Sequence, residues 1–400
     1  MDLLSKIPIL NEPNPRLVLR LVREAESVSR ADLARATGLH PSTITRLVAA
    51  LLEAGLLQES GEGQNDLGRK PIVLSVVEDA IHVVGLAVEA GFVSGVLVNL
   101  GARILERIDL PFPPAAEQDS VLETIFAVVA GLLSRAQARG LDVAGIGVAM
   151  HGTVDSASGI SIFAPAIGWR NVAVAELLEE RFGLPVRMEN NAKAMALGEA
   201  WFGNGQGVRH LLAVKVGQAI GSGVILNGEL FVGANFSAGE IGHTTVISDG
   251  MRCKCGNFGC LETVASIDAV LKKLRVILKR GDGASSLLAQ GDLDPDELTA
   301  DDVYQAVLAG DGLACQLWDE AAAYLGVALA NTMNILNPAK VLIGGDILPI
   351  VDYLLPRIRE VVVARVFDPL KAALQIEPVG LGENAVAVGA ATLVFRELLG

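Results

Sequence analysis

Three of the four cysteines lie within eight residues, in the segment Cys253-Lys-Cys255-Gly-Asn-Phe-Gly-Cys260, and His243 lies ten residues before the first of them. Three thiolates and one imidazole complete the tetrahedral shell of a structural zinc ion. The two glycines of the segment allow the loop to fold back and bring its last cysteine to the metal. The alternative is a disulfide with one spare thiol. Two cysteines separated by one residue suit a metal site better, so we expect these four residues to bind Zn²⁺.

The composition indicates a large folded protein. The chain has 400 residues, which suggests two or three domains, and it is 51% hydrophobic and 20% charged, which favours large cores over disorder. The start of the chain has no secretory-signal pattern, and no uninterrupted apolar run reaches the ~18 residues of a membrane span. We therefore expect a cytoplasmic protein in a reducing compartment, with no membrane partner.

The negative charge lies outside the N-terminal segment. Residues 1–75 hold nine Lys and Arg against nine Asp and Glu, whereas the remainder holds 23 basic and 37 acidic residues, which accounts for the net charge of −14. DNA phosphates would repel such an acidic body. Any contact with DNA must therefore come from the neutral N-terminal segment.

That segment has the pattern of a helix-turn-helix. Apolar residues recur with helical spacing over residues 15–25, and a second helix is expected from the N-cap Ser29 to Gly38. Pro41 opens a third helix that ends at Gly55. The second of two helices joined by a tight turn enters the major groove of DNA in this motif.

Two strands over residues 56–59 and 72–77 then flank a turn with a basic tip, which is typical of a wing that reaches a minor groove. His40 is an unfavourable N-cap for the recognition helix. A helical protein-binding module without a DNA role is the alternative. The groups that we expect to contact DNA are Ser42, Thr43, Thr45, Arg46, Arg69 and Lys70.

The rest of the chain repeats one pattern of strands and helices, which predicts an α/β body of two lobes with a ligand cleft between them. The first copy has three β-rich runs over 81–110, a helix over about 120–139 and a strand at 143–149. The second copy has strands at 211–216, 223–226, 229–232 and 341–345 and helices at 302–309 and 314–337. A helix over 385–399 is expected to return to the first lobe, although its leucines could serve oligomerisation instead.

We therefore expect three parts in the chain. They are a winged helix-turn-helix DNA-binding domain at 1–77, a first lobe at 78–195 with 380–400 returning to it, and a second lobe with the zinc loop at 196–379.

Three motifs together resemble the signature of the ROK family of repressors, open reading frames and sugar kinases. They are Gly239-Glu-Ile-Gly-His243, the cysteine segment continued to Glu262, and Pro185-Val-x-x-Glu-Asn190-x-Ala192. The resemblance covers nearly the whole chain and implies a duplicated, ribonuclease H-like body of the actin/hexokinase ATPase type. The N-terminal segment resembles the regulator branch, such as the xylose and N-acetylglucosamine repressors.

The motifs that a kinase of this family needs are altered. The resemblance places Ala87 where the kinases have an Asp for Mg²⁺, and Glu89 and Ala90 where they have glycines that approach phosphate. A register shifted by two residues would pair Glu89 with that Asp, but it lacks the paired glycines. Asn191 replaces the Asp that deprotonates the sugar, a loss that typically costs ~10²–10⁴ in rate. Ala219 replaces a glycine of the second phosphate loop, so we expect no enzyme activity.

The resemblance also implies a sugar site, lined by Gly152, Asn190, Asn191, Glu240, His243 and Glu262. Carboxylates and amides suit the hydroxyls of a sugar. Simpler roles are open for four of these residues: either glutamate could hydrogen-bond a zinc ligand or cap a loop, Asn190 could be a backbone cap in a turn at the end of a strand, and Gly152 could be a turn residue.

The sequence therefore predicts a sugar-responsive transcriptional repressor of carbohydrate metabolism genes. It would bind operator DNA as a homodimer or homotetramer and respond to a sugar or sugar phosphate, although activation in place of repression is left open. The alternatives are a sugar kinase with a DNA-binding head and a regulator switched by a protein partner. Because Glu240 and Glu262 flank the metal ligands, we also predict that zinc fixes a wall of the sugar site.

Overall fold

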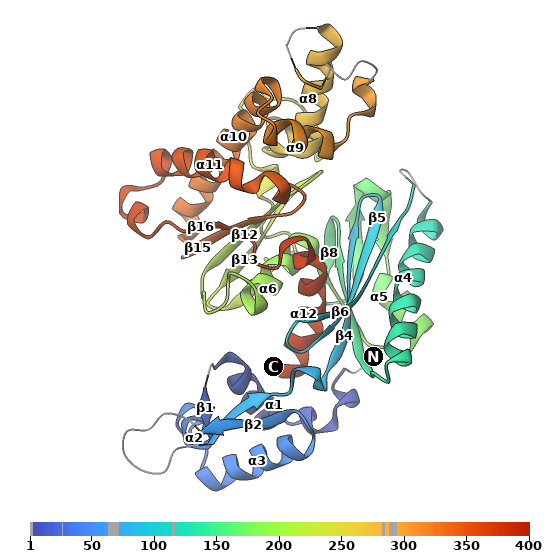
Figure 1. Ribbon diagram of the computed structural model, residues 1–400, viewed down its shortest axis with the longest axis vertical. Helices are drawn as coiled ribbons and strands as arrows, with labels where there is room; N and C mark the ends of the chain where they lie inside the picture. The colour runs from blue at the N-terminus through green and yellow to red at the C-terminus, as the bar shows by residue number, and fades with distance from the viewer. Residues whose placement is uncertain (1–2, 26, 63–71, 114–116, 282–284, 288–293) are drawn as a thin grey trace. The chain divides into compact units, whose positions relative to one another are not determined.

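The chain forms two compact units in a computed structural model that describes residues 3–25, 27–62, 72–113, 117–281, 285–287 and 294–400 (Figure 1). The first unit runs to Glu189 and includes Ala390–Gly400, and the second unit is Asn190–Gly389. The sequence placed the second lobe at 196–379, so the observed unit begins earlier and ends later. At its start, Asn190 already caps the first helix of the second unit.

The N-terminal part of the first unit is a three-helix head with a small antiparallel sheet. Its helices are α1 (Pro13–Glu24), α2 (Arg30–Thr37) and α3 (Pro41–Glu53), and its strands are β1 (Val28–Ser29), β2 (Leu57–Glu62) and β3 (Ile72–Val76). The strand order is β1-β3-β2. Leu33, Ile44 and Leu51 are fully buried between the helices. The predicted helix-turn-helix is confirmed, whereas the predicted basic tip of the wing lies outside the described residues.

Local hydrogen bonds explain where the helices of the head begin. Ser29 and Asp32 form a reciprocal capping box, in which the Ser29 backbone N–H donates to the Asp32 carboxylate at 2.9 Å. The expected weakness at the N-cap of α3 is not observed. His40 Nδ1 accepts a hydrogen bond from the Ser42 backbone N–H at 3.3 Å, because a neutral imidazole has one nitrogen lone pair free to accept.

The remainder of the first unit is built on a sheet with the order β11-β7-β4-β5-β6. β4 pairs antiparallel with β5 and parallel with β7, and β5 pairs antiparallel with β6. A second, smaller sheet has the order β10-β9-β8. The elements are β4 (His82–Glu89), β5 (Phe92–Asn99), β6 (Ile104–Pro111), α4 (Gln118–Ala138), β7 (Val143–Met150), β8 (Thr153–Asp155), β9 (Ile160–Ala164), β10 (Trp169–Val172), α5 (Val174–Phe182) and β11 (Val186–Asn190).

Among the described residues, α4 is the one helix that is long and apolar enough to cross a membrane by length and composition. Its residues Val121, Ile125 and Val128 are fully buried in the core of the first unit. The side of α4 that carries these residues packs on β5 and β6 and must therefore be apolar. Packing in the core thus accounts for the apolar composition of the helix.

The second unit repeats the strand order of the first. Its sheet has the order β14-β13-β12-β15-β16, in which β12 pairs antiparallel with β13 and parallel with β15. β12, β13, β14, β15 and β16 thus take the places of β4, β5, β6, β7 and β11, which confirms the predicted duplicated body. The strands are β12 (Leu211–Val216), β13 (Ile220–Leu226), β14 (Glu229–Phe231), β15 (Lys340–Gly344) and β16 (Ile376–Pro378), and the helices are α6 (Asn191–Phe202), α7 (Glu262–Ala265), α8 (Ile267–Arg280), α9 (Ala300–Leu308), α10 (Gly312–Leu336) and α11 (Val351–Arg365).

The C-terminal helix α12 (Ala385–Leu399) has the predicted bounds, but its leucines are not free. Leu393, Leu398 and Leu399 are at most 6% exposed, so the alternative that they serve oligomerisation is wrong. The helix lies directly against β7, because a Cβ added at Gly147 would lie 1.8 Å from the Ala390 carbonyl oxygen. The sequence of α12 looked amphipathic because small residues lie among its larger apolar residues. Small residues can also pack closely, so the positions that they occupy need not be exposed.

Asp311 is a buried carboxylate that holds the start of α10. Its Oδ1 accepts from the Ala314 backbone N–H at 2.9 Å, and its Oδ2 accepts from the Ser286 N–H at 2.6 Å and from two serine hydroxyls at 2.9 Å. Burial works to raise the pKa of Asp311, but these hydrogen bonds outweigh it and lower the pKa below its usual value.

Asp311→Asn is expected to destabilise the protein by about 1–3 kcal/mol, because an amide NH₂ would face groups that are themselves donors. Since the folded-state pKa lies below the unfolded one, the stabilisation by Asp311 is present above about pH 4 and is lost as the pH falls through the folded-state pKa. Urea unfolding at pH 7 and between pH 5 and 3 measures both effects. Asp301 accepts no hydrogen bond among the described residues, so Asp301→Asn should cost about 0.5 kcal/mol or less; equal losses at pH 7 would contradict the prediction.

Candidate metal centre and effector site

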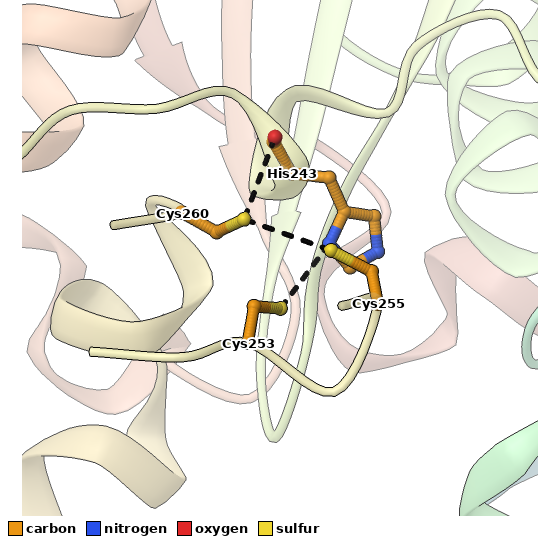
Figure 2. A group of neighbouring side chains, drawn as sticks. All are labelled: His243, Cys253, Cys255 and Cys260. Carbon is orange, nitrogen blue, oxygen red and sulfur yellow. Dashed lines mark hydrogen bonds between the residues drawn. The ribbon is translucent and has the colours of Figure 1, made fainter. Parts of the chain in front are cut away.

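The structure brings the four predicted metal ligands together. His243 ends the short 3-10 helix η5 (Ile241–His243), and the three cysteines lie in the loop that precedes α7 (Figure 2). One donor atom from each residue lies within 4.8 Å of all the others. His243 presents Nδ1 to this group, at 3.6 Å from Cys253 Sγ.

The donor distances fit a tetrahedral zinc site. Zinc bonds of about 2.3 Å to sulfur and about 2.0–2.1 Å to nitrogen give tetrahedron edges of about 3.8 Å between two sulfurs and about 3.6 Å between sulfur and nitrogen. The observed Cys255–Cys260 Sγ distance is 3.7 Å, and the Cys253–His243 distance is 3.6 Å. The disulfide alternative is wrong, because all four cysteines are free and a disulfide needs about 2.0 Å between its sulfurs.

Backbone hydrogen bonds shape the cysteine loop. The Cys253 N–H donates to the Asn257 carbonyl at 2.8 Å, and the Gly256 N–H donates back to the Cys253 carbonyl at 3.0 Å. Gly259 has a φ of 65°, and a Cβ there would lie 1.6 Å from the Ile247 carbonyl oxygen. Gly256 also has a positive φ, of 97°, so the expectation that two glycines let this loop fold back is confirmed.

The thiols of the cluster differ in how readily they lose a proton. Burial raises the pKa of Cys253 and raises that of Cys260 to about 12. For Cys255, burial acts in the same direction, but hydrogen bonds from the Asn257 N–H and from the other two thiols outweigh it and lower the pKa. A divalent cation would favour the deprotonated form of all three.

Two carboxylates lie beside the metal donors. Glu240 Oε2 is 4.0 Å from His243 Nε2, and Glu262 Oε1 is 4.0 Å from Cys253 Sγ. Glu262 Oε2 also accepts from the Ile220 backbone N–H at 3.4 Å, and burial raises the pKa of its carboxyl group. His243 turns Nδ1 to the thiols, so its Nε2 faces the carboxylate of Glu240. A metal-bound histidine commonly has a carboxylate beside the ring nitrogen that does not bind the metal.

The predicted amides lie at the start of α6, also in the second unit. Asn190 is its N-cap, and Oδ1 accepts from the Ala192 N–H at 2.9 Å and the Lys193 N–H at 3.3 Å. Asn191 is the first residue of the helix and is buried. The simpler role considered for Asn190, a backbone cap at the end of a strand, is therefore present in the structure, where the residue caps α6.

Gly152 belongs to the first unit, between β7 and β8. Its φ is 87°, and a Cβ there would lie 2.1 Å from the Phe163 carbonyl oxygen. Backbone packing alone therefore requires a glycine at this position. Its contact with a sugar stays a prediction.

The loops that resemble the phosphate loops of the kinases have other contacts here. Ala87 lies within β4 and is buried. A Cβ on Gly217 would lie 2.4 Å from a carboxylate oxygen of Asp346, and one on Gly223 would lie 2.4 Å from the Ala196 Cβ. The sequence reasoning missed Asp346, although an acid that directly follows Gly344-Gly345 at a strand end was a visible signal.

The predicted DNA contacts that the structure describes lie on α3. Ser42, Thr45 and Arg46 are exposed, and Thr43 is half-buried. Arg46 has no hydrogen-bonding or acidic partner within the described residues, whereas Arg30 pairs with Glu59 at 2.9 Å and Arg35 pairs with Asp32. Arg69 and Lys70 lie outside the described residues.

A helix-turn-helix head followed by a duplicated α/β body with a His/Cys₃ cluster defines a protein that joins a DNA-binding module to an actin/hexokinase-like body. The chain belongs to the ROK family, whose pattern matches residues 85–397. The IclR helix-turn-helix domain matches residues 17–61. The resemblance found in the three sequence motifs is therefore confirmed.

Known relatives cover the chain almost completely. It is 30% identical over 391 residues to a putative xylose repressor of Caldicellulosiruptor sp. (strain Rt8B.4), which covers 98% of this chain and 97% of the relative. A crystal structure of a ROK family transcriptional regulator, a homologue of the E. coli MLC protein, matches with a TM-score of 0.82 and 28% identity over 97% of this chain and 96% of the other.

A kinase of the family is also similar, but over less of the chain. A ROK family glucokinase from Streptomyces griseus, in complex with glucose and AMPPNP, matches with a TM-score of 0.70 and 30% identity. The match covers 79% of this chain and 99% of the glucokinase. The repressor and the regulator named above thus match nearly the whole chain, whereas this kinase does not.

Proposed function

We propose that this protein is a cytoplasmic, sugar-responsive transcriptional repressor of carbohydrate metabolism genes without sugar kinase activity. The observation that carries the proposal is the match to a repressor over 98% of the chain, head included, combined with Asn191 at the position of the kinases' general base. An amide cannot take the proton of a sugar hydroxyl.

The residue at the position of the kinases' Mg²⁺ ligand supports the same conclusion. Ala87 has no group with which to hold Mg²⁺. Restoring the base alone, by Asn191→Asp, should therefore not restore phosphotransfer.

In this proposal the effector site consists of Asn190, Asn191, Glu240, His243 and Glu262, which all belong to the second unit, and Gly152 of the first unit is a separate candidate for sugar contact. The side chains offer the donors and acceptors that a polyol needs. His243 and the three cysteines would hold a zinc ion with all four ligands supplied by the protein, so the ion would stabilise the loop and would not take part in catalysis. His243 would then hold the metal through Nδ1 and leave Nε2 on the side of Glu240.

Repression requires linkage between this site and the head. A homodimer or homotetramer would place two recognition helices on symmetric half-sites of an operator. The sugar must bind one conformation more tightly, and DNA the other, so each weakens binding of the other by the same factor.

One set of measurements on the purified full-length protein tests the proposal. The operator is selected from genomic DNA with the protein itself, and its affinity is measured by fluorescence anisotropy with xylose, glucose, N-acetylglucosamine and their phosphates. We expect one of them to raise the melting temperature and to weaken operator binding, and none to be phosphorylated in the presence of Mg²⁺-ATP. Sugar phosphorylation at kinase-like rates would contradict the proposal, and the absence of any stabilisation would favour a protein partner.

A further inference from the structure

Lys193 is a buried lysine in the first turn of α6 for which the proposed function gives no role. Its side chain is 1% exposed, which is unusual for an ammonium group because leaving water costs free energy. Its backbone N–H donates to Asn190 Oδ1 at 3.3 Å, and its Nζ donates to the backbone carbonyl of Phe236. One residue thus joins the start of α6 to a segment 43 positions further along the chain.

The segment that Lys193 contacts leads directly to Glu240. Phe236 has a φ of 61°, a left-handed conformation that a bulky side chain rarely adopts without outside support. Beyond it, the Gly239 carbonyl accepts from both the backbone N–H and the hydroxyl of Ser222, at 2.9 and 2.7 Å. The ammonium group of Lys193 therefore donates its hydrogen bond to the carbonyl of a residue whose backbone conformation is unfavourable.

The helix that carries Lys193 has a fixed place on the sheet. A Cβ on Gly223 of β13 would lie 2.7 Å from the Ala192 carbonyl oxygen and 2.9 Å from the Lys193 Cα. The backbone of α6 therefore lies in contact with β13, and Ser222 of the same strand holds Gly239. Both α6 and Gly239 are therefore attached to β13. The hydrogen bond from Lys193 to Phe236 then joins α6 directly to the segment that leads to Gly239.

We propose that Lys193 is a positioning residue of the effector site. It fixes the Phe236 carbonyl four residues before Glu240, while the metal ligand His243 fixes the chain three residues after it. Glu240 is then held from both sides and in register with Asn190 and Asn191. The inference rests on the proposed function for the role in sugar binding, but the effect on the loop does not depend on it.

Hydrogen exchange without any sugar tests the positioning itself. Lys193→Met keeps the length of the side chain and removes its donor, and we expect amide exchange in residues 236–240 to become roughly tenfold faster. Lys340→Met is the matched control, because Lys340 is also in the second unit and donates to a backbone carbonyl, that of Asn204, at 3.0 Å. It should leave this segment unchanged. Unaltered exchange in Lys193→Met would overturn the proposal.

Sugar binding tests the consequence. For whichever of xylose, glucose or N-acetylglucosamine stabilises the wild type, we expect the Kd to rise roughly 10- to 100-fold in Lys193→Met and to be partly restored in Lys193→Arg, which keeps a donor. An unchanged Kd would overturn the role in sugar binding. Should Lys193→Met not fold, Lys193→Gln, whose amide is too short to reach Phe236, gives the same exchange readout. If none of these sugars binds the wild type, the proposed function fails, and hydrogen exchange still decides the positioning.

Discussion

Cys255→Ser is expected to abolish stable metal binding and, with it, most of the response of operator binding to sugar. The Cys255 side chain is exposed, so a serine fits without a cavity, and the change removes one thiolate from the set of four ligands. Structural zinc sites of this kind bind with about 10–16 kcal/mol, which makes the loss of a ligand one of the largest effects available in this molecule. Zinc content after gel filtration should fall from about one ion per chain to a small fraction of that.

The physical reason for the lost response is the place of the ligands in the chain. His243 lies three residues after Glu240, and Glu262 lies two residues after Cys260, so the loop that the metal closes carries both carboxylates of the proposed effector site. Without the metal, three thiols and an imidazole have no common partner, and the two carboxylates lose their fixed spacing. Binding of the sugar would then have to order the loop, which reduces its affinity.

Cys315→Ser provides the matched control for this experiment. Cys315 lies in α10, outside the cluster, where its thiol is 3.7 Å from the Val307 carbonyl oxygen. This variant should keep its zinc and its full sugar response. A metal-free Cys255→Ser protein that still releases operator DNA at the wild-type sugar concentration would show that the metal does not position the effector site.

Features that depend on neighbouring residues could be predicted from the sequence. The ends of α2 follow from Ser29 and Gly38, and the start of α3 follows from Pro41, because capping acts within a few residues. The His/Cys₃ cluster could be predicted in the same way, because the chemistry of thiols and imidazole is specific and all four residues lie close together in the chain. The duplicated order of strands followed from two similar patterns of strands and helices.

Other features depend on where distant segments meet, and the sequence does not contain this information in readable form. The partner of Lys193 is a backbone carbonyl, which any residue provides, so no residue type marks it. Asp346 reaches Gly217 only because β12 and β15 are neighbours in the sheet. The close packing of the α12 backbone on β7 likewise joins distant segments, and the cap formed by His40 depends on which ring nitrogen carries the proton.

Arg46→Ala is expected to weaken binding to the operator by roughly 10- to 100-fold, which corresponds to about 1.4–2.8 kcal/mol. Arg46 is exposed on α3, and it has no partner within the described residues, so its guanidinium is free for a bidentate contact with guanine in the major groove. Lysine keeps the charge but not the fork of donors, so Arg46→Lys should retain non-specific binding and lose discrimination between operator and random DNA.

The matched control comes from the helix that precedes the recognition helix. Arg35 is also exposed, but it pairs with Asp32 inside the capping box of α2, so contact with DNA would cost this existing bond. Arg35→Ala should therefore change operator affinity by less than threefold, roughly the effect of one exposed ion pair. Titrations at several salt concentrations separate the two kinds of contact, because loss of a phosphate contact lowers the salt dependence by about one ion, whereas loss of a base contact lowers the affinity for the operator alone. If Arg46→Ala binds operator and random DNA as the wild type does, Arg46 does not read the sequence, and specificity must come from other residues of the head.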